Sequence, residues 1–140
     1  MASLIYNSCI DDMARGAIDF DTDTFYVMLV TSSYAPNKDT DLKRSAVTNE
    51  VGNSGTYAAG GSASACTVTK DTANDKVTMA FASVNWTSAT ITAAAAVIYK
   101  RRGGASSADE LVAYVDFGGN ITSTADTFTV TFSTPITLQN

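Results

Sequence analysis

Three aspartates alternate along one short stretch, and carboxylates at this spacing open the common calcium-binding loops. Asp19, Asp21 and Asp23 form the pattern D-x-D-x-D, which supplies the first three ligands of such a loop. The next position needs a glycine and holds Thr24, and the twelfth needs a bidentate glutamate and holds Val30. We therefore expect a solvated acidic turn, with calcium bound at a different kind of loop as the alternative.

A second pair of carboxylates, Asp71 and Asp75, flanks a short stretch of turn-forming residues. Two carboxylates carry out glycoside hydrolysis only when they face each other across a cleft at a set separation. Aspartates at turn positions more often accept hydrogen bonds from the backbone of the turn. We expect that second role for both residues.

Other common catalytic arrangements are missing from the sequence. The chain has no histidine, which excludes Ser-His-Asp and Cys-His nucleophile systems, and it has no phosphate-binding or dinucleotide-binding glycine loop. Cys9 and Cys66 lie far apart and form no C-x-x-C pair, so a structural zinc site is not expected. We predict reduced, buried thiols, no cofactor, no metal and no enzymatic activity.

One basic cluster stands out in a chain of net charge −5. It consists of Lys100, Arg101 and Arg102. Three cations in an acidic chain are too few for direct binding of nucleic acid, which requires a basic face that releases phosphate counterions. The cluster is therefore either a solvated loop or an anchor for an acidic protein surface, because the planar guanidinium of arginine suits protein interfaces.

Trp86 is the single tryptophan. Together with Tyr57 or Tyr34 it would form a sugar-binding platform if the rings were exposed side by side. A lone tryptophan more commonly packs in a core or an interface. We favour packing and keep the platform as an alternative.

The elements that position these residues are predicted to be strands. Large apolar residues alternate strictly with threonine in residues 128–132, and residues 77–81 and 66–69 repeat the arrangement, with Ala80 in place of one threonine. The stretch 71–75 between the last two of these segments contains turn formers, so residues 66–81 predict an antiparallel hairpin.

Two further stretches, residues 25–30 and 91–99, are apolar on both faces. This pattern is typical of central strands that are covered on both sides. Residues 111–117 predict the next strand, which is reached through the glycine- and serine-containing loop 100–107.

One short helix is predicted near the start of the chain. Asn7 or Ser8 can cap its N-terminus, and Gly16 can end it. Asp11 and Asp12 are expected in its first turn, where the helix dipole favours anions.

Two weaker features complete the organisation of the chain. Residues 39–46 predict a helical turn. Residues 51–64 predict a long loop in which Tyr57 is the one large side chain, and loops of this length are usually functional or mobile.

Composition and length agree with a single all-β domain over residues 1–140. The chain has 140 residues of which 45% are hydrophobic, which is enough to bury a core, and it is rich in β-branched threonine. We predict a jelly-roll-like β-sandwich with one short N-terminal helix. No apolar run approaches the length of a membrane helix, and no secretory signal is recognisable, so we expect synthesis in a cytoplasm and no membrane association.

Several segments resemble a family of small virion proteins of tailed bacteriophages. They are YNS at 6–8, GAID at 16–19, DTFYVMLVTS at 23–32, YAPNKD at 34–39, AVIYKRRGG at 96–104 and DELVAYVDFG at 109–118. Within this group the chain is most similar to the cement, or decoration, proteins of short-tailed phage capsids. The likeness lies in strand and turn sequences and covers most of the chain.

The resemblance implies a jelly-roll domain on the outer surface of a virion shell built from an HK97-type major capsid protein. The implied partners are that capsid protein and a second copy of the chain, as a homodimer that bridges capsomers. A neck or tail component of the virion and a carbohydrate-binding module are the alternative functions.

Partner contacts are expected at the basic cluster, in the N-terminal segment of residues 1–6 and in the long loop. The residues concerned are Lys100, Arg101, Arg102, Ser3, Leu4, Tyr6 and Tyr57. The N-terminal segment is predicted to be flexible and to dock by adding a strand to a partner.

Overall fold

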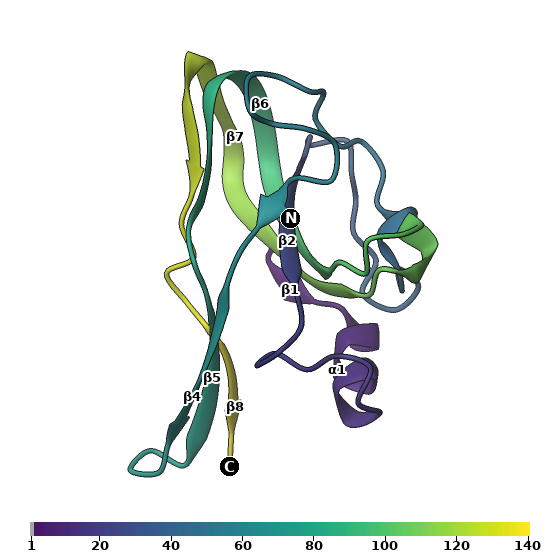
Figure 1. Ribbon diagram of the computed structural model, residues 1–140, viewed down its shortest axis with the longest axis vertical. Coiled ribbons are helices and arrows are strands. Elements are labelled where there is room, and N and C mark those ends of the chain that lie inside the picture. Colours follow the sequence, from purple (N-terminus) through teal and green to yellow (C-terminus); the bar gives the residue numbers. More distant parts are fainter. Residues whose placement is uncertain (1) are drawn as a thin grey trace.

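The structure is a computed structural model that describes residues 2–140 (Figure 1). Its strands are β1 (Leu4–Ile5), β2 (Phe25–Val30), β3 (Ser62–Ala63), β4 (Cys66–Asp71), β5 (Lys76–Phe81), β6 (Val84–Lys100), β7 (Leu111–Val130) and β8 (Ile136–Gln139). Its helices are α1 (Asn7–Ala14) and the 3-10 turns η1 (Arg44–Ala46) and η2 (Ser106–Ala108).

The strands form two antiparallel sheets. One has the order β1-β7-β6-β2-β3 and the other the order β4-β5-β8. The prediction of an all-β sandwich with one short N-terminal helix is thereby confirmed, as is the hairpin over residues 66–81, which is β4 paired with β5. This strand order does not by itself establish a jelly roll, which stays a prediction.

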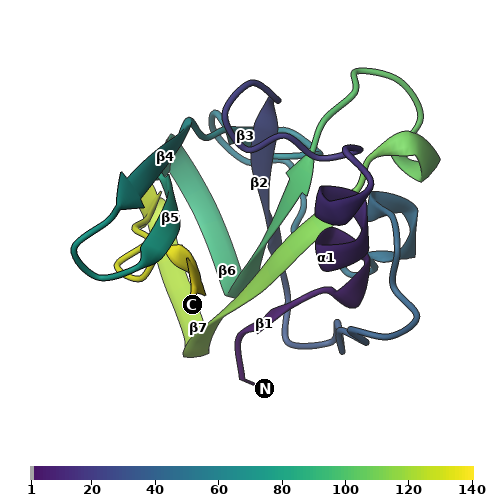
Figure 2. The same cartoon turned by 90° about the horizontal axis from the view of Figure 1, so that it is seen from below.

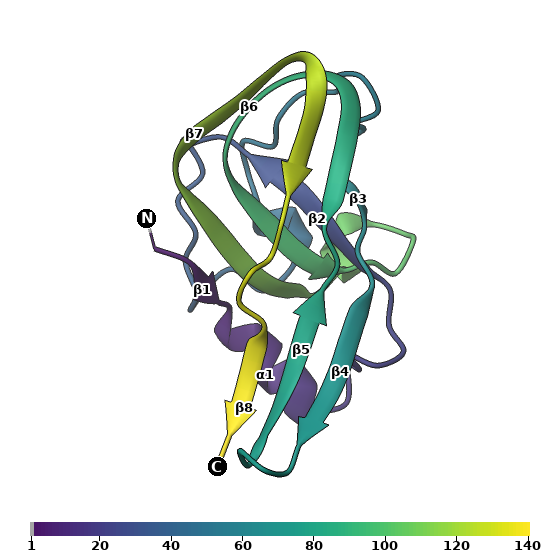
Figure 3. The same cartoon turned by 90° about the vertical axis from the view of Figure 1, so that its left-hand side faces the viewer.

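The long hairpin of β6 and β7 joins the two layers. Figures 1 and 3 show both strands arching over one end of the molecule and turning back, so that the two halves of each strand lie in different layers. The register shifts between Trp86 and Ala89 and between Ala93 and Ala95. Bulges of this kind bend a strand and increase its twist, and positive φ angles at Gly118 and Gly119 serve the same bend.

The main core lies between the two layers. Alternate residues of β2, namely Phe25, Val27 and Leu29, point into it and are at most 1% exposed. Phe25 packs edge-on against Phe81 of the opposite sheet, with ring centroids 5.5 Å apart. This packing explains the alternating pattern of β5, because each inward side chain removes apolar surface from water.

A second apolar cluster covers the other face of the five-stranded sheet. It includes Met28, Val97 and Tyr99, and the N-terminal Tyr6 and the loop residue Tyr34 close over it. The prediction that residues 25–30 and 91–99 are central strands covered on both faces is therefore confirmed. Helix α1 packs against the main core instead, through Cys9 and Met13, and Figure 2 shows it beside β7 and β1.

The helix is present, but its predicted N-terminal details are wrong. The cap is Tyr6, with no side-chain hydrogen bond to the helix, and Asn7 donates instead to Asp39 Oδ1 at 2.6 Å. The acidic residues lie beyond the first turn, where Asp11 forms an i,i+4 pair with Arg15. Tertiary contacts, not capping, therefore position the helix start. The helical turn predicted over residues 39–46 is reduced to η1.

Candidate partner-binding groove

Two residues of the predicted basic cluster are bound within the protein. Lys100 Nζ lies 2.8 Å from Asp23 Oδ2 and donates to the carbonyl oxygen of Ala17 at 2.7 Å. Arg102 Nε donates to both carboxylate oxygens of Glu110, at 2.8 and 3.0 Å. Both side chains therefore hold loops together within the chain.

The sequence analysis did not identify two buried carboxylates that bind cations in this region, Asp109 and Glu110. Asp109 and Glu110 are 1% and 2% exposed. Asp109 accepts from Arg44 Nε at 2.9 Å and from the backbone N–H of Arg102 at 3.0 Å, and Lys43 lies 3.4 Å from Glu110. Burial alone raises the pKa of Glu110, but the hydrogen bond from Arg102 and the nearby cations outweigh it, and the net pKa is lowered.

Arg101 and Arg102 are both exposed, but the Arg102 side chain is engaged by Glu110. The guanidinium of Arg101 lies over the ring of Tyr26 instead, 4.4 Å from the ring centroid. This cation–π contact holds the side chain against the protein surface. Of the three cations, Arg101 is thus the one placed to meet a partner.

Tyr6 and Tyr57, two of the predicted contact residues, lie inside the protein. The Tyr6 hydroxyl is 2.9 Å from that of Tyr34, and burial raises the pKa of Tyr6 to about 12. The Tyr57 hydroxyl accepts from the backbone N–H of Leu29 at 2.9 Å and donates to Glu50 at 2.8 Å. Neither ring reaches the surface, so the role of both side chains in this structure is internal.

Trp86 is a core residue, which confirms the favoured interpretation. It is 1% exposed, its ring centroid lies 5.0 Å from that of Tyr57, and its Nε1 donates to Ser62 Oγ at 2.8 Å. Because Tyr34 is also buried, these three rings offer no exposed platform for a sugar.

The acidic stretch at residues 19–23 is a turn held by its own backbone. Asp19 accepts from the N–H of Asp21 at 2.9 Å, which lowers its pKa, and Asp23 accepts from the N–H of Asp19 at 2.7 Å. Within residues 2–140, no group of three His, Cys, Asp or Glu side chains is placed to hold a metal ion.

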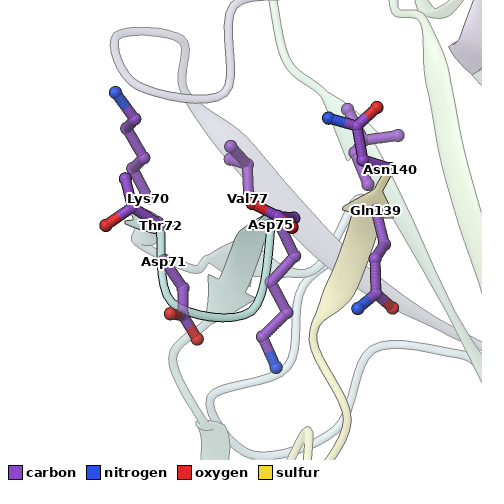
Figure 4. Close-up of a pocket in the computed structure, with 9 residues that line it drawn as sticks. Lys70, Asp71, Thr72, Asp75, Val77, Gln139 and Asn140 are labelled. Atoms are coloured by element: carbon purple, nitrogen blue, oxygen red, sulfur yellow. The ribbon is translucent and has the colours of Figure 1, made fainter.

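At the tip of the β4–β5 hairpin, the expected turn hydrogen bonds are present for Asp71, whereas the Asp75 carboxylate accepts none within residues 2–140. Asp71 accepts hydrogen bonds from the side chain and backbone of Asn74 at 2.8 and 3.2 Å, and these bonds lower its pKa. Asp75 has φ +53° in the turn. Figure 4 shows both residues beside a shallow pocket of about 430 Å³ that Gln139 and Asn140 also line.

Both cysteines are free thiols. Cys9 is buried and Cys66 is half-buried, and burial raises their pKa values to about 12 and about 11. Thiols with such pKa values stay protonated at neutral pH and are poor nucleophiles.

Ser3 and Leu4 do line a surface feature, a groove of about 900 Å³ on one side of the sandwich. The groove lies between the wall formed by β1 with the first half of β7 and the segment that leads from the end of β7 into β8. Its lining residues are Ser3, Leu4, Ile5, the stretch 113–117, Ile121 and the stretch 128–137. The N-terminal segment forms one wall of the groove, because its strand β1 pairs with Tyr114 and Ala113. The prediction that this segment is flexible is therefore wrong for the described residues. Met1 lies outside the described residues.

The groove is lined mainly by apolar side chains. Ile5 and Ile121 are 37% and 48% exposed, and Phe117 and Phe132 are half-buried against the core. Asp116 is the one charged residue of the lining, and its backbone N–H donates to Ser3 Oγ at 2.9 Å. Sequence reasoning did not select these apolar residues, because alternation does not distinguish a groove from a core.

Strand β8 borders the groove with an unpaired edge. It pairs on one side with β5, and within residues 2–140 no strand pairs with its other side. The backbone N–H of Asn140 donates to Asp75, and bonding alternates along an antiparallel strand. The N–H and C=O groups of Ile136 and Leu138 therefore face β5, whereas those of Thr137 and Gln139 face the open edge.

The described residues include no helix that is long and apolar enough to cross a membrane. In comparisons with known proteins, no family model, no curated protein and no solved structure matches this chain.

Proposed function

We propose that this chain is a structural virion protein, a capsid cement protein that binds the outer surface of a major capsid protein shell and bridges its capsomers. The family resemblance of the sequence supplies the virion setting. The observation that supports a binding role is the apolar groove beside the unpaired edge of β8, since exposed apolar surface next to an open sheet edge marks a site for another chain.

The mechanical role requires a rigid body, and the internal contacts provide one. The ion pairs of Arg44 and Arg102 fix the loops at one end of the five-stranded sheet, and two apolar clusters cover both of its faces. A rigid clamp loses little conformational entropy when it binds, so more of the contact energy appears as affinity.

Binding to two capsomers at once multiplies the effect of a modest contact. A standard interface of roughly 1,600 Å² in total gives useful affinity, and a homodimer that spans a junction gains further through effective concentration. Separation of the capsomers under internal pressure then requires the loss of at least one such contact.

The predicted contact residues that remain available are Ser3 and Leu4 at the groove and Arg101 in the loop between β6 and β7. Lys100 and Arg102 act indirectly, by holding the loop that carries Arg101. In this proposal, Tyr6 and Tyr57 support the fold and make no contact with the shell.

Copy number tests the proposal. Virions of the phage that encodes this chain are purified, and the ratio of this chain to the major capsid protein is measured by quantitative gel densitometry or mass spectrometry. A ratio near one copy per capsid subunit is expected. About a dozen copies per virion would assign the chain to the neck or tail instead, and no copies would overturn a virion role.

A further inference from the structure

We propose that the groove receives an extended, uncharged segment of the major capsid protein, which adds to β8 as a further antiparallel or parallel strand. The inference rests on the proposed function and names how its binding surface works. Four features of the structure support it: the difference between the two layers, the orientation of the backbone groups of β8, the charge of the groove and the pairing of the chain's own strands.

The two layers differ in extent on the side of the groove. Strand β7 arches from one layer into the other (Figures 1 and 3), and β1 pairs with the outer side of its first half, at Ala113 and Tyr114. In the other layer no described strand lies beyond the second half of β7 or beyond β8. Figure 3 shows β1 and β8 at the same side of the molecule. One added strand would give the shorter layer a counterpart to β1 and cover the apolar lining between them.

The open edge of β8 offers hydrogen-bonding groups to such a strand. The N–H and C=O groups of Thr137 and Gln139 face away from β5, as the alternation from Asn140 requires. Thr137 itself lines the groove. A strand that enters the groove therefore meets backbone donors and acceptors on one side and apolar side chains on another, which is the arrangement used in recognition by strand addition.

The near absence of charge in the groove indicates which kind of partner segment can bind there. Apart from Asp116 every lining residue is uncharged, and Asp126 is the one charged residue between positions 121 and 140. Native edge strands are usually protected from pairing by charges, above all lysine. The edge of β8 has no such protection, and burial of a charged segment against this lining would leave the charge without a counter-ion. The matching segment is therefore uncharged, with apolar side chains on the face that enters the groove.

A second copy of this chain does not fit the groove as well. Each described strand of the chain is already paired in its own sheet, and most apolar side chains of β2, β6 and the first half of β7 are buried in the chain's own core. An edge strand of a folded copy could lie against β8 but could not place apolar side chains between the layers. An extended segment of a different protein has both faces free.

Two substitutions test the two parts of the contact. Thr137→Pro removes an N–H from the open edge and leaves the bonds between β5 and β8 intact, because proline is tolerated at a strand edge. Ile121→Lys places a charge on an exposed position of the lining. Shells of the phage that lack this chain serve as the probe, and the bound protein is quantified after sedimentation.

Each variant has a matched control outside the groove. Lys70→Pro removes an outward-facing N–H from β4, the opposite edge of the same sheet, since Ala82 N–H bonds to Ala65 and sets the alternation there. Ile10→Lys charges an isoleucine of α1 that is 56% exposed, close to the 48% of Ile121. Circular dichroism and thermal unfolding verify that all four variants are folded.

We expect Thr137→Pro and Ile121→Lys each to bind shells at least tenfold more weakly, and both controls to bind like the unaltered protein. If the unaltered protein binds and both groove variants bind equally well, the strand-addition inference is wrong and the proposed function stands. If the unaltered protein does not bind shells, the proposed function itself fails. A dimer in solution that the groove variants dissociate would place a second copy in the groove and overturn the inference.

Discussion

Close backbone approaches at single residues hold the long loop of residues 51–64 to the sheet. Gly61 has φ +77°, and a Cβ atom there would lie 1.8 Å from the carbonyl oxygen of Val27. Gly55 has φ +55°, and a Cβ atom there would lie 2.2 Å from the carbonyl oxygen of Thr87. Only glycine meets both demands, because other residues disfavour positive φ and carry a Cβ. The loop is thus packed against β2 and β6, and the expectation of a functional or mobile loop has no support in its contacts.

Gly61→Ala is therefore expected to destabilise the protein by more than about 2 kcal/mol, since the cost of a left-handed backbone adds to a clash with backbone atoms that cannot move aside. Chemical denaturation at neutral pH measures the change. Gly52→Ala in the same loop is the control, because Gly52 has nothing within 4 Å of the added atom. Equal stability of the two variants would contradict the close packing of the loop on β2.

Tyr57 connects this loop to β2 through its hydroxyl group. Tyr57→Phe leaves the ring in the core but removes the partner of the Leu29 N–H and of Glu50. An unsatisfied buried donor costs about 1–3 kcal/mol, and we expect a loss of stability in that range by urea denaturation. Tyr114→Phe, also in a buried position but with no hydrogen bond recorded for its hydroxyl among the described residues, should change stability by less than about half as much.

At the scale of elements, the loop between β6 and β7 is fastened by buried carboxylates. Arg102→Ala would leave Glu110, at 2% exposure, with Lys43 as its remaining cation at 3.4 Å. Removal of one partner of a buried ion pair costs about 3–5 kcal/mol, and part of that is avoided here because Arg102 is itself 42% exposed. We expect a loss of about 2–3 kcal/mol in thermal or chemical unfolding.

The neighbouring Arg101→Ala is the contrasting change. Arg101 makes an exposed cation–π contact that is worth about 0.5–1 kcal/mol, so the folded protein should tolerate its loss. This variant therefore tests a basic anchor cleanly by binding to shells, whereas a double change with Arg102 would confuse lost binding with lost folding. Arg101→Ala and Arg102→Ala with equal stabilities would show that the buried pair does not fasten the loop.

Glu110 also predicts how the stability of the protein depends on pH. The pKa of Glu110 lies below its ordinary value of 4.5, so the folded state favours the ionised form. Its contribution is fully present above pH 4.5 and is lost as the pH falls through the lowered pKa of the folded state. Glu110→Gln should be less stable at pH 7 and should lose less stability than the unaltered protein as the pH falls below 4.5. Parallel acid limbs in urea unfolding would contradict this assignment.

Much of the fold was predictable at this scale, and the reasons are local. The pattern of residues 25–30 predicted strand β2 at its observed bounds, because its residues are apolar on both faces and all but Tyr26 are buried. A strand was predicted over residues 128–132, and β7 includes residues 128–130 of it. That β7 runs without a break to this segment, and that β6 begins at Val84, was not predicted, because the bend relies on bulges that local pattern does not reveal. The ion pairs of Lys100 and Arg102 were missed because their partners come into reach only through tertiary structure.

At the scale of the whole molecule, the arched hairpin makes the two layers one mechanical unit. Strands β6 and β7 belong to the five-stranded sheet and stay paired with each other as they arch over into the other layer, so a continuous two-stranded ribbon connects the two layers. The groove lies where the sheets have open edges. Among the described residues, no strand pairs with the outer side of β8 or of the second half of β7. Binding by strand addition at this edge would extend the same sheet into the partner.

A protein of this kind should raise the resistance of the shell to heat if it acts as cement. A ligand that binds the assembled shell and not its separated subunits stabilises the assembled state, and each tenfold excess of free ligand over the dissociation constant adds about 1.4 kcal/mol per site. DNA-filled shells that lack this chain are heated with a DNA-binding dye, with and without the purified protein, and the temperature of DNA release is compared. We expect release at a higher temperature with the unaltered protein and no change with Ile121→Lys, which should stay in solution. Full occupancy without a change in the release temperature would make the chain a decoration that does not reinforce the shell, and would require the bridging of capsomers to be abandoned.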